Sequence, residues 1–156
     1  MPDYSSNFLW FWGGALTVWQ DTALTMGYFY TIGNLGNAWG AWGLRGRNKN
    51  YYALKAFAEV AHYENRVKSS TEDLNLQVLA GKNAEGKRAL LVSSFKNGAD
   101  KLELSLKDAK GVTFKVRKTD LENNDLESTV KVGANGKIVL EGAPEGQSVL
   151  YLLTEE

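Results

Sequence analysis

The chain contains no cysteine and only one histidine, His62. Disulfides and thiolate metal sites are therefore excluded, although the redox compartment stays open because many exported proteins also lack cysteine. A single histidine rules out a histidine-rich zinc site and any catalytic arrangement that uses two histidines. We expect no metal and no cofactor, and we expect His62 to lie on the surface of a helix.

The chain also lacks an excess of charge, because its 18 basic and 18 acidic residues cancel. Binders of nucleic acid or of anionic membranes carry a surplus of positive charge, so neither partner is expected. A long apolar run is missing as well, since residues 8–18 are too short to span a bilayer and follow no basic segment. We therefore predict neither a transmembrane helix nor a signal peptide, and the localisation stays undetermined.

A glycine-rich turn at residues 43–50 and a helix predicted over 51–63 separate two kinds of sequence. Apolar residues recur at i, i+3, i+4 and i+7 along this helix, which predicts one buried stripe, and Asn48 or Asn50 is suited to cap its start. The predicted stripe consists of Leu54, Phe57, Ala58 and Ala61, with Tyr51 one turn earlier. We place a boundary just after this helix, which divides the chain into segments 1–67 and 68–156.

The chain ahead of this glycine-rich turn is aromatic, rich in glycine and nearly free of lysine and glutamate. Its apolar pattern predicts a helix over residues 8–26, with Ser5 or Ser6 as cap, and then a short buried strand at 27–32 and a loop. The helix is apolar nearly all round, so we expect it to be covered on more than one side. With the helix at 51–63, this order is a fragment of the α/β alternation found around parallel sheets.

The second segment alternates short apolar and polar runs with turn residues at regular spacing. The predicted strands are residues 74–79, 88–95, 102–106, 112–117, 128–132, 137–141 and 148–153. Asn-Gly pairs between them suit tight hairpins because both residues tolerate positive φ. About seven short strands with regular turns predict a small antiparallel sandwich or barrel that has its own core.

Residues 81–88 nearly match a phosphate-binding loop, with glycines at the required spacing and Lys87 after the second. The next residue is Arg88, so the hydroxyl that would bind magnesium is missing. The segment also joins two predicted strands instead of leading into a helix. We therefore predict a hairpin here.

Trp39 and Trp42 lie three residues apart among glycines, after the predicted strand. Tryptophan faces stack on sugar rings, and a loop after a strand is where an α/β barrel places ligand-contacting groups. The alternative is that both are core or interface aromatics, as most large aromatic side chains are.

Hydrolysis of a glycosidic bond usually needs two carboxyl groups, one on each side of that bond. Asp21 is the only acid between Tyr4 and Asn50, and the other acids cluster at strand edges and in turns, so the sequence predicts no pair of carboxyl groups in a cleft.

Four stretches of the first segment resemble the last units of a retaining glycoside hydrolase barrel: WGGALTVWQD (12–21), GYFYT (27–31), WGLR (42–45) and YYALKAF (51–57). The similarity is to clan GH-A enzymes of the β-xylosidase and α-L-iduronidase kind, in which such a helix closes a (β/α)8 barrel and a small β-sandwich follows. Residues 78–83, 89–95 and 146–153 are similar to that sandwich. The resemblance implies an α+β chain: a helix-strand-helix remnant of the barrel, then an antiparallel β-sandwich of about seven strands.

The resemblance supplies no catalytic residue. In such enzymes the catalytic glutamates end the fourth and seventh barrel strands, the first commonly after asparagine. By this similarity the chain would begin just after the seventh strand, and it contains no Asn-Glu pair. The resemblance implies sugar contact for Tyr30, at the end of the predicted strand, and for Trp39 or Trp42. We therefore expect an inert, structural or accessory portion of a glycoside hydrolase, from a truncation or from a split or degenerate gene.

The aromatic residues of the first segment would be exposed without the barrel strands on which they would pack. Burying each large side chain is worth about 1.5 to 3 kcal/mol, so we expect this segment to associate. The expected outcomes are a homo-oligomer, association with the missing barrel, or collapse onto the sandwich. The expected ligand of the protein is a polysaccharide or oligosaccharide. Two alternatives stay open: a carbohydrate-binding module, and an assembly protein that docks through its aromatic N-terminal arm.

Overall fold

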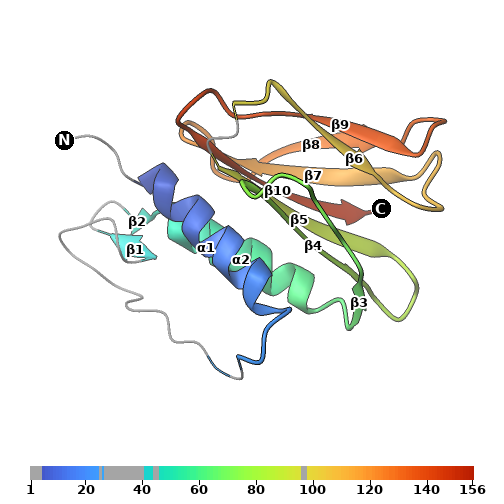
Figure 1. Ribbon diagram of the computed structural model, residues 1–156, viewed down its shortest axis with the longest axis horizontal. Helices are drawn as coiled ribbons and strands as arrows, with labels where there is room; N and C mark the ends of the chain where they lie inside the picture. The colour runs from blue at the N-terminus through green and yellow to red at the C-terminus, as the bar shows by residue number, and fades with distance from the viewer. Residues whose placement is uncertain (1–4, 25, 27–40, 44–45, 96–97) are drawn as a thin grey trace.

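A computed structural model of the protein describes residues 5–24, 26, 41–43, 46–95 and 98–156 (Figure 1). The helices are α1 (Ser5–Trp19) and α2 (Lys49–Ala61). The strands are β1 (Trp42–Gly43), β2 (Gly46–Arg47), β3 (Asn65–Val67), β4 (Leu76–Lys82), β5 (Arg88–Phe95), β6 (Lys101–Ser105), β7 (Thr113–Thr119), β8 (Leu126–Lys131), β9 (Lys137–Glu141) and β10 (Ser148–Glu155). Within these residues, no helix is both long enough and apolar enough to cross a membrane.

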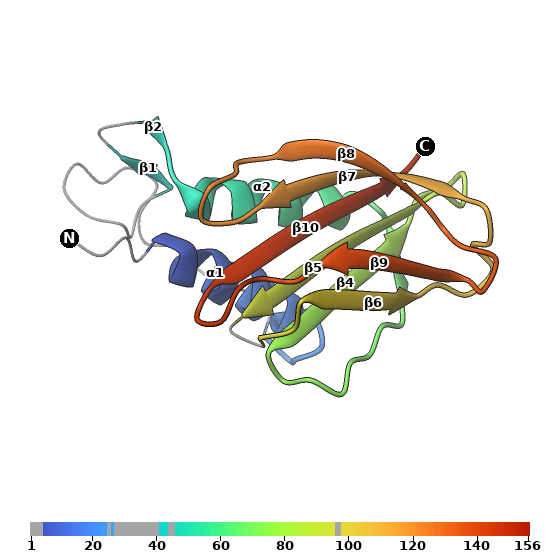
Figure 2. The ribbon, with the colours of Figure 1, turned by 90° about the horizontal axis from the view of Figure 1, so that it is seen from above.

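The strands from β3 onward form a sandwich of two antiparallel sheets. The larger sheet has six strands in the order β3-β4-β5-β10-β7-β8, and the smaller sheet pairs β6 with β9. Figures 1 and 2 show the smaller sheet lying over one face of the larger. Their facing side chains form one core that includes Phe114, Ile138 and Leu153, each almost inaccessible to solvent. The expected α+β class with a C-terminal sandwich is therefore confirmed.

The strands β5 and β10 occupy the middle of the larger sheet and are covered on both faces. Residues 89–94 of β5 and 148–153 of β10 are all buried. A strand that is buried on both faces needs a nearly continuous apolar run, which explains why neither strand alternates strictly. By contrast, β6 has one solvent face, and only Leu102 and Leu104 of its five residues are buried.

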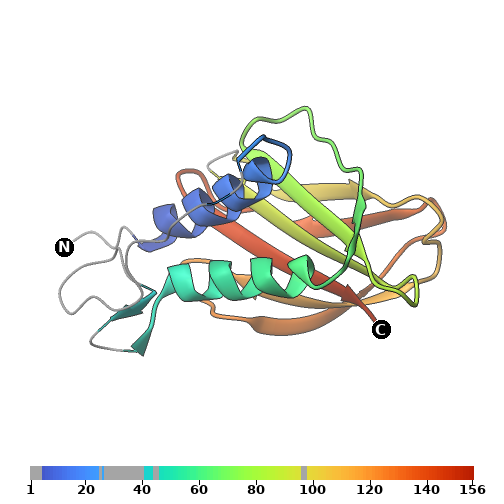
Figure 3. The same ribbon diagram turned by 90° about the horizontal axis from the view of Figure 1, so that it is seen from below.

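The helices α1 and α2 cover the second face of the larger sheet. They lie side by side and run in the same direction across the sheet (Figure 3). A second core joins α2 to the sheet and consists of Ala53, Ala56, Val60, Leu79, Ala89, Leu91, Leu150 and Leu152, with Trp12 of α1 packed against it. Of the outcomes expected for the first segment, its described helices therefore show collapse onto the sandwich.

Gly13 sets how closely α1 approaches the sheet. A Cβ atom at this position would lie 2.9 Å from Leu150 Cδ1 and 3.0 Å from Ser93 Oγ. A Cβ at such distances would force the buried Leu150 and Ser93 side chains to shift, so glycine permits the observed contact. The apolar N-terminal helix thus contributes a glycine where it packs on Leu150 and Ser93 of the sheet.

α1 begins at Ser5 and ends at Trp19, so the helix expected over residues 8–26 is too long at its C-terminal end. The hydroxyl of Thr22 donates a hydrogen bond of 3.0 Å to the Trp19 carbonyl. This bond satisfies a carbonyl that has no partner within the helix and helps to end it. The strand expected at residues 27–32 lies outside the described residues.

α2 begins directly after Asn48, whose side chain accepts hydrogen bonds from the backbone N–H groups of Asn50 and Tyr51. The prediction of Asn48 as the cap is confirmed, and Asn50 lies inside the helix instead. His62 follows the last residue of the helix and is exposed, as expected.

The apolar stripe predicted for α2 is displaced by one residue from the buried one, and the two share only Phe57, which packs against the second core. The buried apolar residues are Ala53, Ala56 and Val60, whereas Ala58 and Ala61 are exposed. A stripe that starts at residue 53 has the same i, i+3, i+4, i+7 spacing as the predicted one that starts at 54. Alanine lies on several sides of this helix, so periodicity alone fits both stripes. The sheet selects the stripe that places small residues where the helix approaches it.

All seven strands predicted for the second segment are present, as β4 to β10. The strand β3 was not predicted, because its three residues include two polar side chains and show no alternation. The segment that resembles a phosphate-binding loop is a hairpin, in which Lys82 pairs with Arg88, as predicted. The division of the chain after residue 67 stays a prediction.

Candidate functional site

The structure describes only part of the predicted sugar-contact group. Tyr30 and Trp39 lie outside the described residues. Trp42 lies in β1, whose backbone pairs with β2 so that Trp42 is opposite Arg47. Gly46, which follows in β2, has a φ of +99°, a conformation that favours glycine. The sugar-contact role therefore stays a prediction, and the structure places Trp42 only through the backbone pairing of β1 with β2.

Two tyrosines at the start of α2 lie beside the β1–β2 pair. The guanidinium carbon of Arg47 is 4.7 Å from the centre of the Tyr51 ring, which is a cation–π contact. The rings of Tyr51 and Tyr52 meet edge to face, with their centroids 5.2 Å apart. Both tyrosines are half-buried, so the strand pair that carries Trp42 is attached to an aromatic helix start that is partly accessible.

Lys49 anchors the start of α2 to the turn between β7 and β8. Its ammonium donates hydrogen bonds to the Asn123 carbonyl at 2.9 Å and to Asn124 Oδ1 at 2.8 Å. Only 8% of Lys49 is exposed, and a buried ammonium needs such acceptors. These contacts fix the start of α2 relative to the sandwich.

Asp120 builds the turn that receives Lys49. Asp120 Oδ1 accepts hydrogen bonds from the Asn123 backbone N–H at 2.7 Å and from Asn123 Nδ2 at 2.8 Å. Burial alone would raise the pKa of Asp120, but the bonds from Asn123 and the nearby Lys118 outweigh burial and lower this pKa. The ionised carboxylate thus holds Asn123 in the position where its carbonyl meets the Lys49 ammonium.

Asp125 links α2 to β7 through charge. Its carboxylate pairs with Lys55 of α2 and lies 3.9 Å from Arg117 of β7, whose guanidinium also pairs with Glu59 of α2. Asp125 has a φ of 53°, which aspartate and asparagine tolerate better than most side chains. The Arg117 and Asp125 side chains are only 13% and 19% exposed. These pairs therefore fasten the polar side of α2 to the sheet.

A second polar cluster lies where β7, β9 and β10 meet. Lys118 Nζ is 3.1 Å from Asp120 Oδ2 and 3.0 Å from Glu141 Oε2, and the Tyr151 hydroxyl donates a 2.9 Å hydrogen bond to the Glu141 carbonyl. Burial would lower the pKa of Lys118, but its bonds to the two carboxylates raise it. Burial raises the pKa of Tyr151 to about 12. Both groups stay protonated at neutral pH, which suits a structural anchor and not proton transfer.

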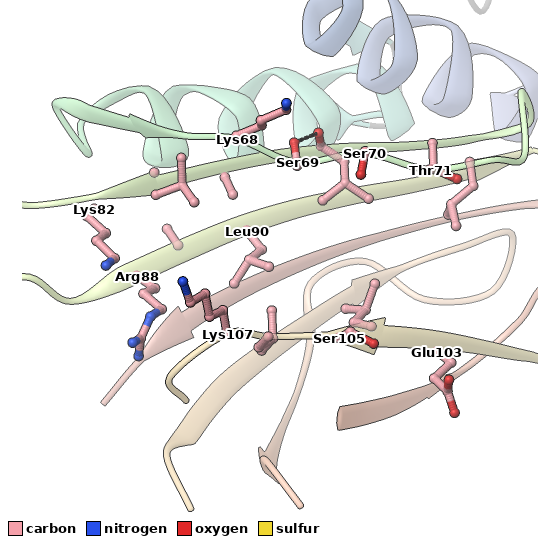
Figure 4. A pocket seen from close by; sticks show the side chains of 18 of the residues that line it. Lys68, Ser69, Ser70, Thr71, Lys82, Arg88, Leu90, Glu103, Ser105 and Lys107 are labelled. Carbon is pink, nitrogen blue, oxygen red and sulfur yellow. Dashed lines mark hydrogen bonds between the residues drawn. The ribbon is translucent and has the colours of Figure 1, made fainter. Parts of the chain in front are cut away.

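A groove of about 710 Å³ opens between the larger sheet and β6 (Figure 4). We call it the β6 groove; it is lined by residues 67–73, 76, 78, 80–82, 88–90 and 103–108. Figure 4 shows Lys82, Arg88 and Lys107 near one another at one end. None of the described residues that line the groove is aromatic, so it does not offer the stacking surface that sugar rings use.

The aromatic residues of the sandwich do not form a sugar platform either. Phe114 and Tyr151 are buried, and Phe95 is half-buried at the end of β5. The spacing of these three residues along the sequence predicts core positions, and this is confirmed for Phe114 and Tyr151. The described sandwich therefore does not favour the carbohydrate-binding module.

The anchoring residues of this region were missed from the sequence. Lys49 contacts Asn123 across 74 positions, and Lys55 contacts Asp125 across 70. Patterns within one sequence report neighbours along a helix or strand, so they carry no signal for such distant pairs. The one local signal is the run of Asn and Asp residues at 123–125, which is typical of a turn but does not indicate which distant residue contacts that turn.

The helices and the sandwich together reproduce one portion of a glycoside hydrolase-like fold. The structure of a GH30 endoxylanase from Clostridium papyrosolvens C71 matches 99% of this chain, with a TM-score of 0.70 and 16% identity. A glucosidase from Croceicoccus marinus matches 100% of it, with a TM-score of 0.69 and 13% identity. The GH39 enzyme from Xanthomonas axonopodis pv. citri matches 97%, with a TM-score of 0.60 and 16% identity. The resemblance inferred from the sequence is thus confirmed at the level of the fold.

This chain spans 39%, 43% and 41% of the lengths of these three structures, respectively. No family profile and no curated protein matches the sequence. Identities of this size show a shared fold, and function has to be argued from the residues of the site.

Proposed function

We propose that this chain is the non-catalytic C-terminal portion of a glycoside hydrolase, with a structural or accessory role beside the barrel. One observation supports the proposal above others: three such enzymes match nearly all of this chain with about two fifths of their own length. The described residues contain no group of His, Asp or Glu side chains suited to hold a metal. Near α2, the carboxylates of Glu59 and Asp125 are engaged in ion pairs. Catalysis would then depend on carboxylates of the remaining barrel.

The DNA that precedes the codon for Met1 tests this proposal. We expect it, or a neighbouring gene, to encode βα units with an Asn-Glu pair after the fourth strand and a second glutamate after the seventh. Co-expression of that product should restore hydrolysis of a xylan or an aryl glycoside, whereas this chain alone should show no turnover. Turnover by the purified chain alone would contradict a non-catalytic role.

We further propose that Tyr30, Trp39 and Trp42 contact a polysaccharide or oligosaccharide. The support is the anchored position of β1: Arg47 holds the strand pair against Tyr51, and Lys49 holds the helix start against the sandwich. A stacking side chain works best on such a fixed support. Xylo-oligosaccharides and gluco-oligosaccharides are the first ligands to test, because an endoxylanase and a glucosidase are among the matches.

Tryptophan fluorescence during titration with these oligosaccharides measures the contact. We expect a saturable change in the unaltered chain that is lost in Trp39→Ala and Trp42→Ala. Trp19→Phe is the matched control, because Trp19 packs edge to face on Trp12 at 6.3 Å within α1. An unchanged titration in both alanine variants, or no response to any oligosaccharide, would remove the sugar-contact role without affecting the proposed place in a larger enzyme.

We also propose that the chain associates through the C-terminal end of α1 and the residues just after it, either with a second copy or with the barrel. Support comes from three large apolar side chains at and after the end of this helix, Val18, Leu24 and Met26, which are 47%, 50% and 63% exposed. This exposure also favours the assembly alternative. Light scattering after size exclusion should show a mass above the monomer that falls in Leu24→Ser/Met26→Ser, and a monodisperse monomer would contradict self-association.

A further inference from the structure

The strand β6 has a hydrogen-bonded partner on one edge only. It pairs with β9, and the smaller sheet contains no other strand among the described residues. The β6 groove lies along its second edge, between β6 and the strands β4 and β5 of the larger sheet. Six strands therefore face two, and the sandwich is open on the β6 side.

The ladder between β6 and β9 fixes which backbone groups reach this open edge. Just beyond its two ends, Leu106 N donates to Gly136 O and Gly142 N donates to Asp100 O, both at 2.8 Å. In an antiparallel ladder, hydrogen-bonded residues alternate with residues whose N–H and C=O point to the opposite edge. The backbone groups of Lys101, Glu103 and Ser105 therefore point away from β9, toward the free edge of β6, and Glu103 and Ser105 also line the groove.

The floor of the β6 groove is aliphatic. Leu76 and Val78 of β4 line it and are only half-buried, although both pack against the sandwich core. Leu90 and Leu104 line it from β5 and β6. An added strand that placed every second side chain toward this floor would continue the sandwich core and bury Leu76 and Val78 further.

Charge distinguishes the two ends of the groove and disfavours a second copy as the occupant. Figure 4 places Lys82, Arg88 and Lys107 at one end and Glu103 toward the other. If two copies of β6 paired in antiparallel orientation over all five residues, Glu103 would face Glu103, and like charges directly opposite destabilise a ladder. A strand with a basic residue opposite Glu103 and an acidic residue near Lys107 has the complementary pattern.

We propose that the β6 groove binds an extended peptide strand that pairs antiparallel with the free edge of β6. The backbone groups of Lys101, Glu103 and Ser105 supply the hydrogen bonds, and alternate apolar side chains of the strand enter the groove. The charged side chains of β6 restrict this edge to strands of matching charge. This binding mode is independent of the proposed glycoside hydrolase origin.

The probe is the fluorescently labelled peptide Asp-Val-Thr-Val-Lys-Val-Thr. In antiparallel register its lysine faces Glu103 and its aspartate lies near Lys107, just past the end of β6. Its three valines point to the side of β6 that carries Leu102 and Leu104. Titration of the whole chain into this peptide should give a saturable rise in fluorescence anisotropy. A peptide of the same composition in scrambled order should not compete.

Two proline variants separate edge pairing from general damage to the sheet. Glu103→Pro removes an N–H that points toward the groove and leaves the bonds to β9 intact, since an edge strand tolerates proline at such positions. We expect this variant to weaken peptide binding about tenfold, which corresponds to about 1.4 kcal/mol. Val139→Pro is the matched control, because Val139 lies opposite Glu103 and its N–H points to the far edge of β9. It should bind the peptide like the unaltered chain.

Glu103→Thr completes the set, because it keeps the N–H but loses the charge and the 2.5 Å ion pair with Lys137. It should bind the peptide more tightly than Glu103→Pro does. Equal binding by Glu103→Pro and Val139→Pro would overturn the proposal, and so would competition by the scrambled peptide or no binding at all. A dimer of the unaltered chain that Glu103→Pro dissociates would assign the edge to a second copy and would also overturn it. Thermal unfolding of each variant shows whether it is folded.

Discussion

The two faces of the six-stranded sheet are covered in different ways. On the helix side, small residues such as Gly13 and Ala53 permit close approach, and ion pairs around Asp125 fasten α2. On the sandwich side, large side chains such as Phe114 and Ile138 fill the space, but two strands face six. We therefore expect the stability of the sandwich side to depend on buried apolar volume. The stability of the helix side should depend on how closely the helices fit the sheet and on ion pairs.

The largest effect is expected where volume dominates. Phe114→Ala removes a fully buried ring from the sandwich core and should lower the free energy of unfolding by about 3 to 5 kcal/mol. Leu126→Ala is the control, because Leu126 is a large apolar residue that is 52% exposed, and it should cost no more than about 0.5 kcal/mol. Urea unfolding followed by circular dichroism measures both values, and similar losses would contradict the role given to the sandwich core.

The next effect concerns the fit of α1 on the sheet. Gly13→Leu adds a side chain where even a Cβ atom would lie 2.9 Å from Leu150, so we expect a loss of about 1 to 3 kcal/mol from overpacking. The tryptophan emission should shift as well, because Trp12 packs beside this contact. Val18→Leu, at an exposed position of the same helix, should leave both measurements nearly unchanged. If Gly13→Leu cost as much as Phe114→Ala, the proposed difference between the faces would fail.

More of the sandwich than of the helical layer could be predicted from the sequence, because its signals are local. Alternation along a strand is a local pattern, so every strand from β4 to β10 was recovered, and the spacing of Phe114 and Tyr151 indicated core positions. The face of α2 that packs on the sheet was missed because alanines on several sides allow more than one stripe, and only the sheet decides between Ala53 and Leu54. The contact of Lys49 with Asn123 and the open edge of β6 were missed as well, since both depend on which distant segments meet.

Charge on the helix side should have a smaller effect than fit. Asp125→Asn keeps the left-handed backbone conformation, which asparagine also tolerates, but removes the charge that pairs with Lys55 and lies near Arg117. We expect a loss of about 1 to 2 kcal/mol at low salt that shrinks at high salt. Asp108→Asn is a matched control with the same φ of 53°, because Arg88 bonds only its backbone carbonyl. A loss that did not depend on salt would contradict an electrostatic role for Asp125.

The smallest effect is a pH dependence of the free energy of unfolding. It tests whether a polar contact also stabilises the sandwich side. The pKa of Tyr151 is raised from 10.0 to about 12, so the unfolded chain releases this proton at lower pH than the folded chain does. The contribution of Tyr151 is therefore complete below about pH 10 and is lost as the pH rises through about 12. In Tyr151→Phe, the free energy of unfolding should fall less steeply with pH over this window, and the lost bond to the Glu141 carbonyl should cost about 0.5 to 1.5 kcal/mol at neutral pH. If the free energy of unfolding, measured in urea, changed equally with pH in both proteins, Tyr151 would contribute only its buried volume, like its apolar neighbours. Polar contacts would then matter on the helix side of the sheet alone, and the two faces would differ more clearly.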